Sequence, residues 1–177
     1  MKYSLRSLEL VPLNDAEYLD FAQQQLVETA RQRVKGGDWQ EAEALDLSRA
    51  SLTDLLSDSL RVAGHMFLKG VDTSGTRVGW LWVSPAPEFL GENRDRKRWL
   101  SQITVESHLR HRGYGRALLA ALHHRLEEQG VEELWLRVYH WNETAIRLYE
   151  TTGYDEIKRF PTDSHMRRRI TNSAAVP

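Results

Sequence analysis

A glycine-rich turn in the middle of the chain is the feature that most constrains its fold. Residues 110–119 read RHRGYGRALL, with two glycines one residue apart just before an apolar helical run. The segment Trp99–Val105 before this turn is typical of a strand, and so is the segment ELWLRVY after the helix. A helix that joins two strands of one sheet favours a parallel, right-handed crossover. We therefore expect an α/β fold organised around this unit.

The same turn has the chemistry of an anion site. Free N–H groups at a helix N-terminus bind anions, and Gly113 and Gly115 leave room for a phosphate to approach the backbone. The nearby positive charges are Arg110, Arg112 and Arg116. Arg116-Ala117 stands where a P-loop needs lysine and a hydroxyl residue, and Leu118 where a dinucleotide fingerprint needs a small residue. Taken alone, the segment fits a tight structural turn with solvated arginines equally well.

The beginning of the chain predicts a strand over Tyr3–Leu10 and then a helix. Asn14 with Glu17 forms a capping box that opens this helix, and Gly36-Gly37 ends it. Its apolar stripe consists of Leu19, Ala22, Leu26 and Val34. Ser51 with Asp54 is typical of the start of a second helix. The apolar face of that helix consists of Leu52, Leu55, Leu56 and Leu60.

The remaining elements follow from turn signals. HMFLKGV and RVGWLWV flank DTSGT, which predicts an antiparallel hairpin. A long polar loop follows, and loops of this length are often functional. Asn142 caps a short helix that stops at Gly153, and two short strands are expected at Asp155–Phe160 and His165–Ile170.

Composition excludes several classes of function. The chain has 177 residues, enough for one domain with a sizeable core, and its net charge of -1 gives no electrostatic case for nucleic acid as a partner. We expect no membrane partner, because no apolar stretch approaches the ~18–20 residues of a membrane span. The N-terminus lacks the apolar core of a signal peptide, so a cytoplasmic location is expected. The cysteine count of zero excludes a disulfide scaffold, a thiolate metal site and a catalytic cysteine.

Two motifs carry a family resemblance. ITVESHLRHRGYGRALL, followed by LRVYHWNETAIRLYETTGY, resembles the GNAT superfamily of acetyl-CoA-dependent N-acetyltransferases. Arg110, Gly113 and Gly115 match the pyrophosphate loop of that family. Its second motif is matched by Asn142, Ala145, Leu148, Tyr149, Gly153 and Tyr154. The resemblance covers residues 99–157 and implies an acyltransferase that uses acetyl-CoA as the acetyl donor.

The resemblance also implies the architecture. The family fold is a mixed, mostly antiparallel sheet flanked by helices, which splays between the strands Trp99–Val105 and Leu134–Tyr139 to hold the pantetheine arm of acetyl-CoA. We expect a single acetyltransferase domain over residues 1–170 and a disordered tail over residues 171–177.

By the same resemblance, main-chain groups that pair with pantetheine belong to Ile103, Thr104 and Val105. The pyrophosphate is held by the loop residues Arg110, His111, Arg112, Gly113, Tyr114, Gly115 and Arg116. Asn142 and Ala145 contact the cofactor arm, a role that Asn142 can combine with capping its helix. No metal is expected.

The resemblance also implies that Tyr149 is the general acid. An amine that attacks a thioester expels a thiolate, and a phenol of pKa about 10 can protonate it. Taken alone, a tyrosine at this helical spacing is more often a core residue than a catalyst. Because the chain has no cysteine, transfer through an acyl-cysteine is impossible, and direct attack in a ternary complex is expected.

The general base is where the chain departs from the family. Gln102 stands where many members have a glutamate, and an amide cannot accept the proton of the amine. A loop carboxylate such as Glu92, Glu106 or a histidine acting through water, and loss of the proton to solvent, remain open. We expect that no single residue dominates.

The acceptor stays open among small amines, antibiotics, polyamines, lysine side chains and protein N-termini. The loop Pro85–Arg98 either frames the acceptor site or is a solvated loop. A non-catalytic acetyl-CoA-binding module is the alternative function, and a domain acting through protein or nucleic-acid contacts is a second one. Oligomeric state is not readable from the sequence, and a homodimer is one candidate.

Other signals favour structural interpretations. The pairs His108/His111 and His123/His124 lack the spacing of a metal site and are interpreted as surface or rim histidines. The run Arg167–Arg169 is interpreted as a solvated edge strand. Four strand aromatics are expected to pack in the core or line the acceptor pocket: Trp80, Trp82, Trp99 and Tyr139.

Overall fold

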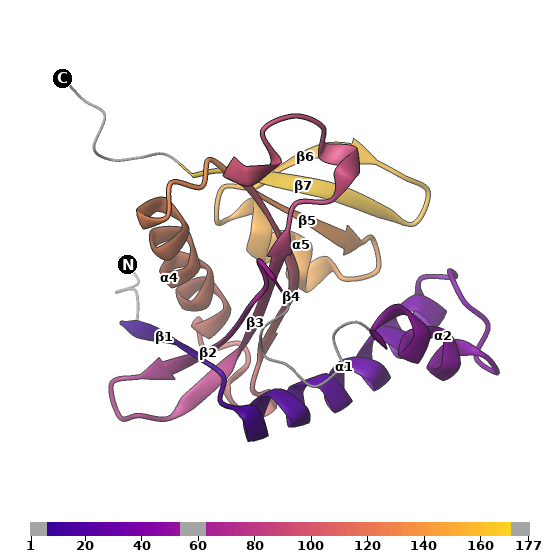
Figure 1. Ribbon diagram of the computed structural model, residues 1–177, viewed down its shortest axis with the longest axis horizontal. Helices are drawn as coiled ribbons and strands as arrows, with labels where there is room; N and C mark the ends of the chain where they lie inside the picture. The colour runs from indigo at the N-terminus through magenta and orange to yellow at the C-terminus, as the bar shows by residue number, and fades with distance from the viewer. Residues whose placement is uncertain (1–6, 54–62, 171–177) are drawn as a thin grey trace.

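A computed structural model describes residues 7–53 and 63–170, which form a seven-stranded open sheet with helices on both faces (Figure 1). The strand order is β1-β2-β3-β4-β5-β7-β6, and the pair β4–β5 is parallel whereas the other five pairs are antiparallel. The strands are β1 (Leu8–Pro12), β2 (Met66–Asp72), β3 (Arg77–Pro85), β4 (Lys97–Val105), β5 (Glu133–Tyr139), β6 (Asp155–Arg159) and β7 (Asp163–Arg169). The expected mixed, mostly antiparallel sheet is confirmed.

Helices lie on both faces of this sheet. The α-helices are α1 (Asp15–Lys35), α2 (Ala44–Ser51), α4 (Tyr114–Glu128) and α5 (Glu143–Glu150). Short 3₁₀ turns are η1 (Glu88–Leu90), η2 (Arg94–Arg96) and η3 (Ser107–Leu109). Figure 1 shows α4 and α5 on one side of the sheet and α1 with α2 on the other.

The side chains of the strands divide into two cores. The larger core packs leucines of α4 and Tyr149 of α5 against strand residues such as Leu81 and Leu136. The smaller core lies under α1 and consists of Leu13, Tyr18, Phe21, Phe67 and Trp80. We call the sheet surface beneath α1 the α1 face.

The first helix forms as predicted, but its buried stripe matches the prediction only in part: Ala22 is buried, and Leu26 and Val34 are half-buried. Asn14 and Glu17 make both hydrogen bonds of the capping box, and Gly36 is the C-cap. The predicted stripe was wrong at Leu19, whose side chain is 58% exposed. The helix instead turns Tyr18 and Phe21 toward the sheet, because their rings pack edge-on against the ring of Phe67.

The other sequence predictions place most elements within a few residues. The hairpin β2–β3, the parallel pair β4–β5 and the two C-terminal strands are confirmed. Ser51, predicted to open a helix, is the last residue of α2. Residues 3–6 of the predicted first strand, residues 54–60 of the predicted second helix and the tail 171–177 lie outside the described residues.

The prediction that Arg167–Arg169 form a solvated edge strand was wrong. Arg167–Arg169 belong to β7, which lies between β5 and β6 and is therefore not an edge. Arg167 forms an ion pair with Glu133 at 3.2 Å, and the Arg168 guanidinium donates to the carbonyl of Thr152. Arginine is tolerated inside the sheet because neighbouring strands and turns supply these oxygen partners.

The sheet opens between β4 and β5. Their pairing covers only Lys97–Trp99 against Glu133–Trp135, at the beginning of both strands. On its other side β4 pairs with β3 through a register shift, in which Trp82 lies opposite Gln102 and Val83 opposite Leu100. Ser101 is thus the extra residue of a β-bulge, which bends a strand and increases its twist. The bulge lies where β4 leaves β5, and it accounts physically for the opening.

Candidate active site

The open edge of β4 is the first part of the candidate site. Beyond Trp99, no strand of the described part of the chain pairs with the side of β4 that faces β5. Ile103, Thr104 and Val105 lie on this stretch and are half-buried. A strand edge without a partner presents main-chain N–H and C=O groups to an extended ligand. This is the arrangement expected for main-chain pairing with a pantetheine arm.

The glycine turn shapes the second part of the site. Gly113 is the N-cap of α4 with φ of 86°, in the left-handed region that favours glycine, and it makes no side-chain capping hydrogen bond. A Cβ added there would meet nothing within 4 Å. His111 also has a positive φ, 59°. The space in front of this helix terminus is therefore accessible to an anion, and the first turn of a helix leaves its N–H groups without intrahelical partners.

A different feature explains why position 115 is a glycine. A Cβ on Gly115 would lie 3.1 Å from Cδ2 of Leu148 on α5. Gly113 therefore leaves open space in front of the helix, whereas Gly115 permits close packing of α4 on α5. The phosphate contacts expected at both glycines stay a prediction. The sequence motif could not separate these two roles, because α5 follows much later in the chain.

Two of the loop arginines hold neighbouring elements together. Arg116 donates to both the carbonyl and the hydroxyl of Thr151, at 2.9 and 3.0 Å, and so ties α4 to the end of α5. Arg110 donates through Nε to the carbonyl of Val105 at 3.2 Å and joins the loop to the end of β4. Arg112 and Tyr114 complete the turn, with Arg112 exposed and Tyr114 buried.

Asn142 lies just after β5, at the start of α5. Its Oδ1 accepts a hydrogen bond from the N–H of Ala145 at 3.2 Å, so it is the N-cap of α5 as predicted. This bond uses the amide oxygen. The amide nitrogen offers donors that a cofactor can use, so capping and ligand contact are compatible.

Tyr149 lies on α5 inside the larger core and is 7% exposed. Its ring packs 5.4 Å from that of Tyr154. Burial raises the pKa of the Tyr149 hydroxyl above its usual value of 10, so this group stays protonated at neutral pH. A protonated phenol is the form that a general acid requires.

Gln102 and Glu106 differ in their surroundings. Gln102 donates to the hydroxyl of Thr104 at 3.2 Å, both side chains lying on the α1 face. Glu106 forms an ion pair with Arg77 of β3 at 2.8 Å, at the far end of β4 from the bulge. The side chain of Glu106 is therefore held against β3.

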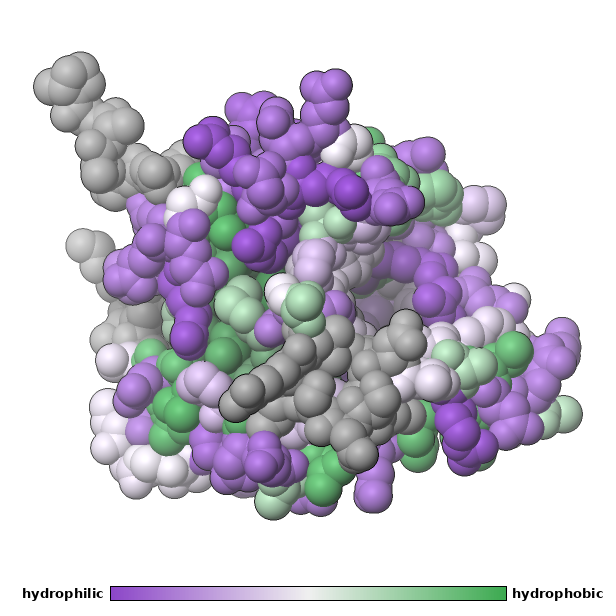
Figure 2. All heavy atoms as spheres, viewed as in Figure 1, coloured by the Kyte–Doolittle hydropathy of each residue, from purple (hydrophilic) through white to green (hydrophobic). Residues whose placement is uncertain are grey.

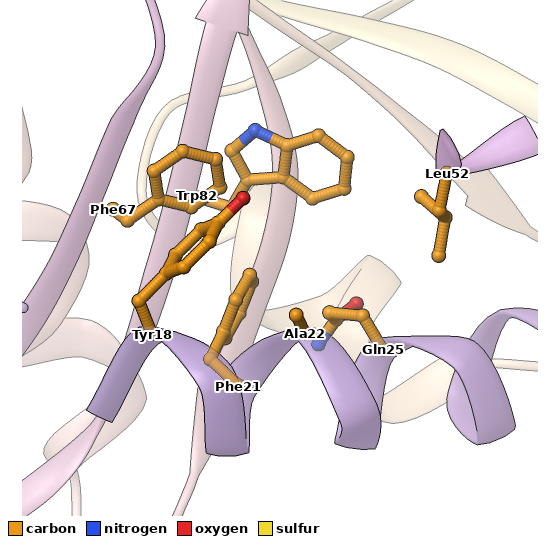
Figure 3. A pocket seen from close by; sticks show the side chains of 7 residues that line it. All are labelled: Tyr18, Phe21, Ala22, Gln25, Leu52, Phe67 and Trp82. Carbon is orange, nitrogen blue, oxygen red and sulfur yellow. The ribbon is translucent and has the colours of Figure 1, made fainter. Parts of the chain in front are cut away.

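The aromatic side chains of β3 have separate roles. Trp80 is buried in the smaller core, whereas Trp82 lines a hollow on the α1 face with six other side chains (Figure 3). The others are Tyr18, Phe21, Ala22, Gln25, Leu52 and Phe67. The indole N–H of Trp82 donates to Nδ1 of His65 at 2.9 Å. Burial lowers the pKa of His65, which favours the neutral imidazole that accepts this bond.

The turn after α1 reaches across the α1 face to β5. Asp38 accepts hydrogen bonds from Arg33 at 2.8 Å, from Arg137 at 3.1 Å and from the hydroxyl of Tyr139 at 2.7 Å. Burial alone would raise the pKa of Asp38, but these donors outweigh it and lower the pKa. Burial, together with the bond to Asp38, raises the pKa of Tyr139 to about 12. The sequence did not predict this tie between the turn and β5, because Arg137 and Tyr139 lie 99 and 101 positions after Asp38.

The histidine predictions were partly wrong. His123 is half-buried and packs inward: its Nε2 lies 3.0 Å from the hydroxyl of Tyr154, and burial with the nearby Arg168 lowers its pKa to about 3. Across residues 7–53 and 63–170, no group of three or more potential ligands is placed to hold a metal ion. Among the helices of those same residues, none is long and apolar enough to cross a membrane.

Comparisons with known proteins agree with this geometry. Residues 25–154 match the acetyltransferase (GNAT) family, which is more than half of the chain. The N-acetyltransferase YycN of Bacillus subtilis is 29% identical over 150 residues, which cover 85% of this chain and 94% of YycN. Its crystal structure superimposes with a TM-score of 0.80 at 28% identity, covering 88% of this chain and 97% of that one.

Two further relatives are named for different substrates. The ribosomal protein bS18 alanine N-acetyltransferase of Escherichia coli is 46% identical over 57 residues, 32% of this chain and 38% of the enzyme. Spermidine N-acetyltransferase of Vibrio cholerae, solved with CoA and spermine, shares the fold with a TM-score of 0.62 at 16% identity, covering 92% and 95% of the chains. The matched family, the open sheet and the glycine turn together show that this chain belongs to the acetyltransferase (GNAT) family of acyltransferases.

Proposed function

We propose that this protein binds acetyl-CoA and transfers its acetyl group directly to a primary amine in a ternary complex. The observation that carries the proposal is the opening between β4 and β5. The edge of β4 is free along this opening, and the N-terminus of α4, which no side chain caps, follows the end of β4. Membership of the GNAT family supports the choice of acetyl-CoA as the donor.

The cofactor site is built from main-chain groups. Acetyl-CoA would supply the acetyl group as a thioester and retain the sulfur as a thiolate. Ile103–Val105 would hydrogen-bond its extended arm through the edge of β4. The N–H groups of residues 110–116 would bind its pyrophosphate, helped by the helix dipole. Asn142 and Ala145, at the start of α5, would fix the arm from the other side of the opening.

Two proton transfers complete the reaction. Tyr149 would donate its hydroxyl proton toward the sulfur as the carbon–sulfur bond breaks, and its raised pKa keeps that proton in place until then. The attacking amine must lose a proton, and Gln102 cannot accept it. With Glu106 in an ion pair with Arg77, this deprotonation falls chiefly to solvent and depends on the basicity of the acceptor itself.

The test is release of free thiol from acetyl-CoA by the purified full chain with a broad panel of primary amines. We expect amine-dependent release together with a ternary complex, seen as intersecting lines in double-reciprocal plots. CoA binding without release by any amine would favour the non-catalytic binding module. Failure to bind CoA in calorimetry would refute the proposal altogether.

A further inference from the structure

A group of partly exposed aromatic rings lies on the α1 face beside the place where β4 leaves β5. Trp99 is the last residue of β4 that pairs with β5, and its side chain lies on the same face as Trp82 and Gln102, as the strand alternation and register require. We call this group the aromatic box. It consists of Phe89 on η1, Trp99 on β4, Phe160 after β6, and His165 on β7.

The rings of the box contact one another through His165. The imidazole lies 5.2 Å from the ring of Phe89 in a stacked arrangement, 5.3 Å from Trp99 and 4.9 Å from Phe160. Phe89 and Trp99 meet edge to face at 5.7 Å. Phe89 remains 62% exposed, although it is a large apolar side chain. An exposed apolar cluster of this kind is typical of a binding surface.

The hollow of Figure 3 differs from the box in its burial. Phe21 and Phe67, which line that hollow, are 3% and 5% exposed, so their rings already serve as the packing between α1 and the sheet. The box keeps ring surface free for a ligand. Figure 2 shows a hollow in the molecular surface between α2 and the strands β6 and β7. Hydrophilic side chains gather over the loop that carries η1 and η2.

The charges around the box disfavour a polycation. On β5 and β7, the carboxylate of Asp163 is paired with Arg137 at 2.8 Å and that of Glu133 with Arg167 at 3.2 Å. The ammonium of Lys158 lies 4.8 Å from the ring of Phe160. The loop 85–98 contains three acidic and four basic residues, a net charge of +1. The strand carboxylates beside the box are thus paired and the loop has a net positive charge, which gives a second positive charge on the acceptor little attraction.

We infer that the acceptor is a monoamine with one aromatic or bulky apolar substituent, and that this substituent packs in the aromatic box. The inference rests on the proposed acetyl transfer and names its substrate class. Trp99 of the box is where the opening between β4 and β5 begins. A substituent packed in the box would be removed from water, and the amine nitrogen attached to it would reach the opening.

The test compares three probe amines in the thiol-release assay: 2-phenylethylamine, n-butylamine and spermidine. We expect kcat/KM to be at least roughly ten-fold higher for 2-phenylethylamine than for n-butylamine, because burying a ring contributes more than burying a short alkyl chain. Spermidine should be the poorest of the three.

The box is tested by Phe89→Ala, which should lower the ratio of kcat/KM for 2-phenylethylamine over n-butylamine by about ten-fold. The same two amines are compared in both proteins, so the difference in their basicity cancels. Leu19→Ala is the matched control, since Leu19 is 58% exposed and lies on α1; it should leave the ratio unchanged. A preference for spermidine, or an unchanged ratio in Phe89→Ala, would overturn the inference.

Calorimetry separates failure of the box from failure of the transfer reaction. 2-Phenylethylamine is titrated into the CoA-bound full chain and into its Phe89→Ala variant. If no amine releases thiol but 2-phenylethylamine binds and Phe89→Ala weakens that binding, the box stands and the proposed transfer fails. If 2-phenylethylamine does not bind, the box is refuted whether or not another amine is acetylated.

Discussion

Replacing Asp38 by asparagine tests how the turn after α1 is held against β5. The side chain keeps its size but loses the charge that accepts hydrogen bonds from Arg33, Arg137 and Tyr139. Hydrogen bonds to charged groups contribute about 1.5–3 kcal/mol each, and those between neutral groups about 0.5–1.5 kcal/mol. Two features limit the loss. The Asp38 side chain is 23% exposed, and Arg137 retains its ion pair with Asp163.

We therefore expect Asp38→Asn to lower the free energy of unfolding at pH 7 by about 1–2 kcal/mol, with a fall in Tm of roughly 2–8 °C for a chain of this length. Because the pKa of Asp38 is lowered in the folded state, its contribution is complete above the ordinary pKa of the carboxyl. It is lost as the pH falls through the lowered value. The difference between wild type and variant should therefore narrow as the pH falls from about 5 toward 3.

Urea unfolding at several pH values measures both effects. Asp46→Asn is the matched control, because Asp46 pairs with Arg49 at the surface and its side chain is 85% exposed; it should change stability by less than about 0.5 kcal/mol. Equal stability of wild type and Asp38→Asn at pH 7, or a difference that does not change with pH, would refute the reasoning.

Gly113→Val should weaken CoA binding at least roughly ten-fold in calorimetry, because its side chain would occupy the space in front of the α4 N-terminus. Gly75→Val, at a similar φ of 81° in the β2–β3 turn, carries the same backbone strain and should leave that affinity unchanged. Gly115→Val should instead lower Tm through its clash with Leu148, and an unchanged Tm would contradict this role. Tyr149→Phe should reduce turnover by roughly 10²–10⁴-fold with CoA affinity retained, whereas unchanged turnover would assign the tyrosine to packing alone. The acid limb of the pH–rate profile should follow the pKa of each acceptor amine; a limb fixed across amines and abolished by one substitution would reveal a dedicated base.

The features that could be predicted from the sequence depend on neighbours along the chain. The capping box of Asn14 and Glu17, the β2–β3 hairpin and the cap at Asn142 involve contacts over a few residues, so local pattern determines them. The order of strand, glycine turn, helix and strand likewise implies a parallel pair, because a helix between two strands of one sheet leaves few other connections.

The features that the sequence could not decide depend on strand order and on which face each element covers. Arg167 lies in an interior strand because β6 folds back outside β7, and no local signal distinguishes that arrangement from an edge. Leu19 is exposed because the rings of Tyr18 and Phe21 pack better against the sheet. Local pattern alone determined the turns, the caps and the glycine motif. The aromatic box, the roles of the two glycines and the tie at Asp38 were decided only by the tertiary structure, since each joins side chains that the sheet topology brings together from distant segments.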